Sequence, residues 1–307
     1  MESYIYAIDV GGTTIKLALF TVDGTLEETF SIKTNHADGG EHVFEDLAEA
    51  IKEKTPDLHA IEGIGMGVPG PVKDTTVYGA VNVGWGELDV AKRLKDALKA
   101  DIPVYVENDV NLAAIGEFHE HKSIHSMVLI ALGTGIGGGV ILSGEIHAGH
   151  NGAAGEFGHM KLRTHGPRCN CGNIGCFETL SSAKAIRAKA EEHIQKGRKT
   201  LMKKSGTINA KVVFDAAKSG DELALEIVDK ACYYIARAIQ IITTAYDPEA
   251  VYIGGGMSKA GDFLIDRITK HYKKIAFKNL ANTPIHQATL VERANIYGGY
   301  ALVKYHG

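Results

Sequence analysis

The chain has 307 residues, of which 45% are hydrophobic and 23% charged, and its 33 basic and 37 acidic side chains give a net charge of −4. This composition excludes a disordered or fibrous chain, and the length favours two domains. The most basic stretch, residues 196–204, is short and has no aromatic residue, so we expect no nucleic-acid partner. The N-terminus has neither a basic leader nor a long apolar span, so we expect no membrane segment and a cytoplasmic location.

Two segments, residues 4–20 and 127–144, share one pattern. Each runs as an apolar strand, a turn rich in Gly and Thr, and a second apolar strand. The repeat predicts two halves built alike, each opening on a β-hairpin whose turn exposes backbone N–H groups.

The remaining segments alternate between helical and strand patterns. Between the hairpins, helical spacing covers residues 41–54 and 87–100, and apolar strands lie within residues 60–70 and 102–109. After the second hairpin the chain is mostly helical, with one further strand. We expect that strand at residues 250–256 and helices at 181–197, 209–220, 221–246, about 260–280 and 294–305. This order predicts an α/β protein with a domain break near residue 112.

The glycine-rich turns favour a phosphate site. The segment LGTGIGGGVIL (132–142) nearly matches G-x-G-x-x-G, but a strand follows where a dinucleotide site needs a helix, and GGTTIK (11–16) lacks the Walker A spacing. Two matched turns, with a third glycine cluster at residues 254–256, instead predict that backbone N–H groups bind phosphate, together with the hydroxyls of Thr13 and Thr134. Either turn alone would also suit a hairpin without a ligand. Asp9 precedes the first turn, where its carboxylate suits a hydrated Mg²⁺ or turn stabilisation.

The strand at residues 102–109 ends in three polar residues, Glu107, Asn108 and Asp109. Asn and Asp are favoured helix N-caps, and Asp109 would cap the helix that follows. The carboxyl ends of strands in α/β sheets also hold ligands, and a carboxylate there can accept the proton of an attacking hydroxyl. Combined with paired phosphate turns, this pattern favours a kinase for a small alcohol.

Three of the four cysteines, Cys169, Cys171 and Cys176, lie within eight positions, and His159 precedes them by ten residues. Cytosolic thiols stay reduced, so a Cys3His set predicts a structural zinc site, with a redox pair or coincidence as the alternatives. Cys232 is predicted to be an ordinary buried thiol. Glu156 and Glu178 flank the cluster, and zinc binding would hold their carboxylates in fixed positions suited to a polyhydroxyl ligand.

Five motifs in this order resemble those of the ROK family (repressors, open reading frames and kinases) of bacterial sugar kinases: IDVGGTTIK, END, LGTGIGGGVI, GAAGEFGHM and CNCGNIGCFE. The likeness covers essentially the whole chain. It implies the duplicated actin-like, hexokinase-type (ribonuclease H-like) fold, with two α/β domains closing over sugar and ATP, and usually a homodimer. We expect residues 1–111 with 292–307 as the small domain and 112–291 as the large one.

The resemblance also implies roles for individual residues. It implies that Asp109 is the general base for the sugar 6-hydroxyl. It also implies that His159, Cys169, Cys171 and Cys176 bind zinc, and that His159 contacts the sugar as well. The other implied sugar contacts are Gly70, Asn82, Asn108, Glu156 and Glu178. The implied contacts to the nucleotide and its Mg²⁺ are Asp9, Gly11, Gly12, Thr13, Lys16, Gly133, Thr134, Gly135 and Gly255.

The substrate is less sharply indicated than the reaction. The pattern of Glu156, His159 and Glu178 is most similar to the glucokinase group, which implies glucose 6-phosphate as product. Kinases for N-acetylated hexosamines, allose, fructose and β-glucosides share much of it. Family repressors carry an added helix-turn-helix module, whereas only three residues precede the first strand here, so we expect an enzyme. A sugar-binding protein that has lost catalysis is the third alternative.

Overall fold

The computed structural model describes residues 3–306. The chain folds into two compact units. The first unit comprises residues up to Ile124, Gly139–Ala154 and residues from Glu292 onward, and the second comprises His125–Gly138 and Gly155–Val291. The domain limits expected from the sequence, residues 1–111 with 292–307 and 112–291, stay a prediction.

The first unit contains a five-stranded sheet in the order β3-β2-β1-β4-β8. β1, β2 and β3 are antiparallel neighbours, whereas β1, β4 and β8 run parallel. Their bounds are β1 Tyr4–Val10, β2 Thr14–Thr21, β3 Leu26–Lys33, β4 Ile61–Val68 and β8 Val104–Asn108. A small antiparallel sheet joins β5 (Val72–Lys73), β6 (Thr76–Ala80) and β7 (Trp85–Asp89).

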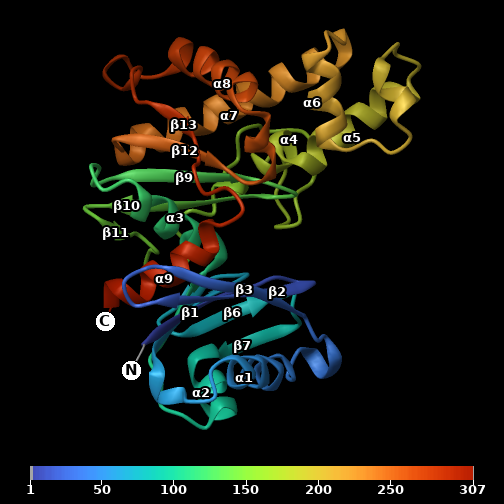
Figure 1. The fold of residues 1–307 in the computed structure, drawn as a ribbon. Coiled ribbons are helices and arrows are strands. Elements are labelled where there is room, and N and C mark those ends of the chain that lie inside the picture. The colour runs from blue at the N-terminus through green and yellow to red at the C-terminus, as the bar shows by residue number, and fades with distance from the viewer. Residues whose placement is uncertain (1–2, 307) are drawn as a thin grey trace. The chain divides into compact units, whose positions relative to one another are not determined.

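Helices cover both faces of the five-stranded sheet (Figure 1). Successive side chains of a strand point to opposite faces, so Tyr6 and Ile8 of β1 pack in the core with α1 (Val43–Lys54) and α2 (Val90–Leu98). Ile5 and Ala7 pack on the other face with α9 (Ala294–His306).

Helix α3 (Asp109–Glu120) crosses α9 at very short range because glycines face each other's backbones. A Cβ on Gly298 would lie 1.9 Å from the carbonyl oxygen of Leu112, and one on Gly116 would lie 2.1 Å from that of Ala294. Only glycine allows this approach, which fixes α3 and the polar residues at its start against the sheet.

The other five-stranded sheet has the order β11-β10-β9-β12-β13, and its strands β9, β12 and β13 belong to the second unit. Its strands are β9 Met127–Leu132, β10 Ile136–Leu142, β11 Glu145–Ile146, β12 Ala250–Gly254 and β13 Ile285–Gln287, and β9, β12 and β13 run parallel. The α-helices of the second unit are α4 Glu178–Ser181, α5 Ala183–Gln195, α6 Ala210–Lys218, α7 Glu222–Tyr246 and α8 Asp262–Ile275. The order matches that of the first sheet strand for strand, which confirms the expected duplicated α/β fold.

The sequence patterns missed β3 and gave the start of α2 incorrectly. β3 was not predicted, because its residues alternate between partly and fully exposed and include few apolar side chains. Residues 87–100 were expected as one helix, but β7 takes residues up to Asp89 and α2 begins at Val90, where the Asp89 carboxylate accepts the N–H of Lys92. Among residues 3–306, no helix combines the length and apolar character needed to cross a membrane.

Candidate active site

Polar residues of the first unit gather at the carboxyl edge of its parallel strands. Asp9 on β1 pairs with Gly67 on β4, and Gly67 pairs in turn with Glu107 on β8. Asn108, opposite Val68, ends β8. The fold therefore brings the first glycine turn and the END motif to one edge, where open α/β sheets bind ligands.

The first glycine turn, residues 11–13, is closed by its own backbone and held by a neighbouring residue. Gly11 N–H donates to Thr14 O at 3.2 Å, and a Cβ on Gly11 would lie 2.7 Å from that oxygen. The hydroxyl of Thr34, a residue only 2% exposed, donates to Gly11 O at 2.7 Å. Thr13 and Lys16 are exposed, as side chains that meet a phosphate must be.

Asp9 is half-buried and held by a residue distant in the sequence. Asn295 at the start of α9 donates its Nδ2–H to Asp9 Oδ1 at 2.8 Å. Burial raises the pKa of the Asp9 carboxyl, and Asn295 and Lys16 oppose that shift. One carboxylate beside a phosphate turn fits Mg²⁺, which usually binds through few protein ligands, retained waters and substrate phosphates.

Asn108, not Asp109, caps α3. Asn108 Oδ1 accepts the N–H groups of Val110 at 2.9 Å and Asn111 at 3.2 Å, and its Nδ2 donates to Gly70 O at 3.0 Å. The interpretation of Asp109 as the helix N-cap is therefore wrong, since Asp109 is the first residue inside the helix. Its carboxylate accepts the N–H of Val110 at 2.9 Å.

Glu107 lies beneath these residues and is 9% exposed. Its Oε1 accepts the N–H of Asn108 at 2.7 Å and Nδ2–H of Asn111 at 3.0 Å. Burial raises the pKa of the Glu107 carboxyl, although both hydrogen bonds lower it. The Oδ1 of Asn111 has no hydrogen-bond partner among the described residues. Glu107 thus ties the end of β8 to the first turn of α3.

Two expected sugar contacts of the first unit have well-defined backbone neighbours. Asn82 is exposed, and a Cβ on Gly12 would lie 3.0 Å from its carbonyl oxygen. Gly70 has φ +119 and would bring a Cβ within 2.3 Å of Gly79 O, so only glycine can present its carbonyl to Asn108. The phosphate turn therefore lies directly against the segment that carries Asn82.

The second glycine turn, residues 133–135, contacts the acid that follows the cysteines. Glu178 Oε2 accepts the N–H of Ile136 at 3.0 Å, and a Cβ on Gly135 would lie 2.5 Å from the same oxygen. Gly133 O accepts the N–H of Ala183 at the start of α5, at 2.9 Å. A predicted nucleotide contact and a predicted sugar contact are thus neighbours in this unit, and Thr134 is exposed beside them.

The third glycine cluster follows the adjacent parallel strand, because Gly254 of β12 pairs with Ala131 of β9. Gly255 has φ +76, and a Cβ there would lie 2.6 Å from Leu132 O. The close approach explains why this expected nucleotide contact is glycine, and it places Gly255 beside the second turn.

His159, Cys169, Cys171 and Cys176 offer one ligand atom each, all within 4.8 Å of one another. Zn–S bonds of about 2.3 Å and Zn–N bonds of about 2.0–2.1 Å in a tetrahedron place two sulfurs about 3.8 Å apart, and a sulfur and a nitrogen about 3.6 Å apart. The Sγ atoms of Cys171 and Cys176 are 3.7 Å apart, and Cys169 Sγ lies 3.5 Å from His159 Nδ1. The donor set therefore fits zinc.

The surroundings of the cluster shift the pKa values of its thiols in opposite directions. Backbone hydrogen bonding at Asn173 lowers the pKa of the Cys171 thiol to about 7, whereas burial raises that of Cys176 to about 12. His159 directs its other ring nitrogen, Nε2, toward Glu156, whose Oε2 lies 3.8 Å away. One imidazole thus joins the cluster to a predicted sugar contact.

Comparisons with known proteins agree with this geometry. A family model described as "ROK family" matches residues 5–306. The chain belongs to the ROK family. A glucokinase from Halalkalibacterium halodurans is 38% identical, over 99% of this chain and 96% of its own length.

A solved structure and a more distant relative extend the comparison. The crystal structure of a ROK family glucokinase from Streptomyces griseus, in complex with glucose and AMPPNP, matches with a TM-score of 0.81 at 27% identity and covers 99% of this chain and 100% of its own. A putative xylose repressor from Caldicellulosiruptor sp. is 28% identical over 97% of this chain and 77% of its own length.

Two residues of this ROK chain that support the site were given no role from the sequence. Asn295 contacts Asp9 across 286 positions, and no local pattern links them. Glu107 had a usable signal, because it ends a buried strand directly before Asn108, where an acid has to be satisfied by nearby donors.

Proposed function

We propose that this ROK protein is an ATP- and Mg²⁺-dependent glucokinase that phosphorylates the 6-hydroxyl of glucose, with Asp109 as general base. One observation carries the proposal: in each unit a glycine turn suited to phosphate lies directly against a residue suited to sugar. Gly12 lies against Asn82, and Gly135 against Glu178. A phosphoryl donor and a polyhydroxyl acceptor are what a sugar kinase must hold side by side.

The phosphoryl transfer requires positioning, charge neutralisation and a base. Asp109 is held at the start of α3 by the Asn108 cap, and its carboxylate accepts the proton of the attacking hydroxyl. The turns formed by Gly11, Gly12 and Thr13 and by Gly133, Thr134 and Gly135 direct N–H and hydroxyl donors at the phosphates. Mg²⁺ bound with the nucleotide supplies positive charge at the transferred group, and Asp9, Lys16 and Gly255 complete the nucleotide side.

The sugar is recognised by charged and amide side chains. Glu156, His159 and Glu178 are the sugar contacts of the second unit, and Gly70, Asn82 and Asn108 are those of the first unit. Carboxylates accept strong hydrogen bonds from hydroxyls, and the zinc cluster keeps His159 and Glu178 in place by closing residues 159–176 into one knot.

We infer further that zinc is a resident structural ion and that the protein acts as a cytoplasmic homodimer at the entry of glucose into glycolysis. Reduced thiols of that compartment suit a Cys3His site. Elemental analysis of purified protein should return one zinc per chain, and size-exclusion chromatography with light scattering measures the assembly.

The second candidate is a ROK protein that binds sugar to regulate transcription, and the likeness to a repressor is its support. ADP release with Mg·ATP separates the two, measured across glucose, mannose, fructose, allose, N-acetylglucosamine and N-acetylmannosamine. The highest kcat/KM with glucose supports the proposal. A clear preference for another sugar would make that sugar the substrate in place of glucose. Sugar binding without turnover favours the regulator.

A further inference from the structure

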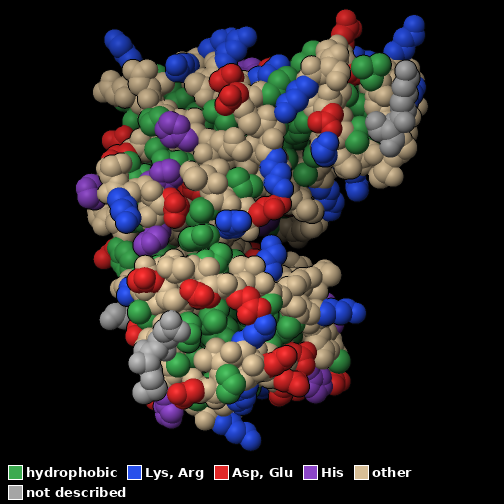
Figure 2. All heavy atoms as spheres, in the orientation of Figure 1, with side chains coloured by type: hydrophobic (Ala, Val, Ile, Leu, Met, Phe, Trp, Pro, Cys, Tyr) green, Lys and Arg blue, Asp and Glu red, His purple; other side chains and the backbone are tan. Residues whose placement is uncertain are grey.

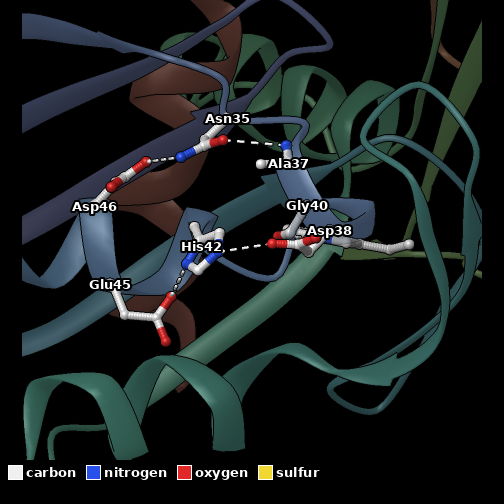
Figure 3. Close-up of polar contacts among 8 residues, drawn as sticks. Asn35, Ala37, Asp38, Gly40, His42, Glu45 and Asp46 are labelled. Atoms are coloured by element: carbon white, nitrogen blue, oxygen red, sulfur yellow. Dashed lines mark hydrogen bonds and ion pairs between the residues drawn. The ribbon is translucent and has the colours of Figure 1, made fainter.

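The segment between β3 and α1, which we call the bridge loop (residues 34–42), contacts both the first glycine turn and the segment that carries Asn82. Figure 3 shows its interior, with Asn35, Asp38 and His42 turned toward partners in the loop and on α1. All of these residues belong to the first unit. Of the loop residues, only Thr34 was described above, as the residue that holds Gly11.

At one end the bridge loop holds the carbonyl groups of the glycine turn. The Thr34 hydroxyl donates to Gly11 O at 2.7 Å, and Thr34 N–H donates to Thr13 O at 3.0 Å. His36 Nε2 lies 2.8 Å from Gly12 O. A carbonyl oxygen can only accept, so His36 Nε2 carries a hydrogen and donates it. Fixing these carbonyls also fixes the direction of the adjacent N–H groups that serve the phosphates.

At its other end the bridge loop packs on residues 80–85. Trp85 donates its Nε1–H to Gly40 O at 3.0 Å, and a Cβ on Gly40 would lie 2.6 Å from Val83 O. The Trp85 ring is buried and stacks on Phe44 of α1 at 5.0 Å. These contacts flank Asn82 on its C-terminal side, so movement of that segment has to reach the loop.

Polar contacts also join residues of the bridge loop to one another and to α1. Asn35 Oδ1 accepts the N–H of Ala37 at 3.1 Å, while its Nδ2 donates to Asp46 on α1 at 3.3 Å. His42 lies 3.2 Å from Asp38 and 3.9 Å from Glu45 (Figure 3). These contacts tie the bridge loop to α1 as well as to the segments at its two ends.

We propose that His36 is a positioning residue through which the bridge loop couples the Asn82 segment to the first glycine turn, so that sugar and nucleotide bind with positive cooperativity. The proposal deepens the kinase function above and rests on it. Sugar binding at Asn82 fixes residues 80–85, the loop carries this order to His36, and His36 fixes Gly12 for the nucleotide. By reciprocity the nucleotide must tighten sugar binding by the same factor.

Trp85 is the only tryptophan of the chain and lies inside the proposed path, so its fluorescence reports on it. Glucose is titrated with and without Mg·ADP, and the ratio of the two Kd values is the coupling factor. We expect His36→Leu to reduce this factor about two- to tenfold, the range of one net hydrogen bond, with the glucose Kd without nucleotide unchanged. His36→Gln restores an N–H donor and should recover the factor, while KM for ATP follows the same pattern.

His59 is the matched control, because it is also an exposed histidine of the first unit but lies outside the bridge loop. His59→Leu should leave the coupling factor at the wild-type value. An unchanged factor in His36→Leu, or equal losses in His36→Leu and His59→Leu, overturns the proposal while glucose turnover still upholds the kinase.

A second readout needs no sugar. Mg·ADP alone should change Trp85 emission in the wild type and less in His36→Leu, because His36 links Gly12 to the loop that contacts Trp85, in addition to the direct approach of Gly12 to Asn82. Equal changes in both proteins overturn the coupling, even if the substrate is a sugar other than glucose.

Discussion

Gly135→Ala tests whether the second glycine turn fixes the Glu178 carboxylate. The new Cβ would lie 2.5 Å from Glu178 Oε2, whereas ordinary van der Waals contact begins near 3.4 Å. The carboxylate therefore has to move by about 0.9 Å, and it loses the N–H of Ile136, which it now accepts at 3.0 Å. The obstructed group is the end of a side chain, so the fold itself can adapt.

Stability and activity should respond differently to this change. A hydrogen bond to a charged acceptor contributes about 1.5–3 kcal/mol, and displacement of Glu178 from the sugar removes one in the complex. We expect kcat/KM for glucose to fall about 10- to 100-fold. In the free protein the carboxylate finds water instead, so Tm should fall by less than about 5 °C.

Coupled ADP-release kinetics and thermal melts measure the two effects. Gly86→Ala is the control, because a Cβ there would meet nothing within 4 Å, and it should match the wild type in both assays. Adding Glu178→Gln to Gly135→Ala should cost little more than either change alone, since both act on one group. Wild-type kcat/KM in a folded Gly135→Ala protein would refute the reasoning.

Three further predictions test other parts of the site. Asp109→Asn should keep Tm and the glucose Kd but lower kcat at least ~10²-fold; a near-normal kcat in steady-state assays would remove Asp109 from catalysis. Cys171→Ser should lose the zinc measured by elemental analysis, together with stability and glucose affinity; full activity without zinc would contradict the structural role. Burial raises the pKa of Glu107 above its ordinary value of 4.5, so the native state binds the carboxyl proton more tightly than the unfolded chain does. The free energy of unfolding therefore falls as pH rises from about 4.5 through the pKa of the folded protein. Glu107→Gln keeps the acceptor and removes the charge, so urea unfolding between pH 4 and 8 should show a smaller fall; an unchanged slope would mean that Glu107 does not titrate there.

Much of the fold was predictable because it rests on local patterns. The apolar runs around the two glycine turns predicted β1 with β2 and β9 with β10. The helical spacing of apolar residues predicted α1, α5, α6 and α7. The short strands β5 and β6 were missed, since strands of two and five residues are too short to show a clear period. The choice of Asn108 as cap over Asp109 also depends on where β8 stops, which a pattern fixes only within a few residues.

The sequence by itself determined the chemistry that spacing along the chain controls: the Cys3His ligand set, the paired glycine turns and the strand-end position of Asp109. Ligands ten or fewer residues apart and turns of three residues close through local backbone geometry. The tertiary structure alone decided which of these groups touch, as in Asn295 on Asp9, Gly12 against Asn82, Glu178 on the second turn and His36 on Gly12. Such contacts follow from sheet register and the crossing of helices, and these are set by packing of the whole core, which no short segment encodes.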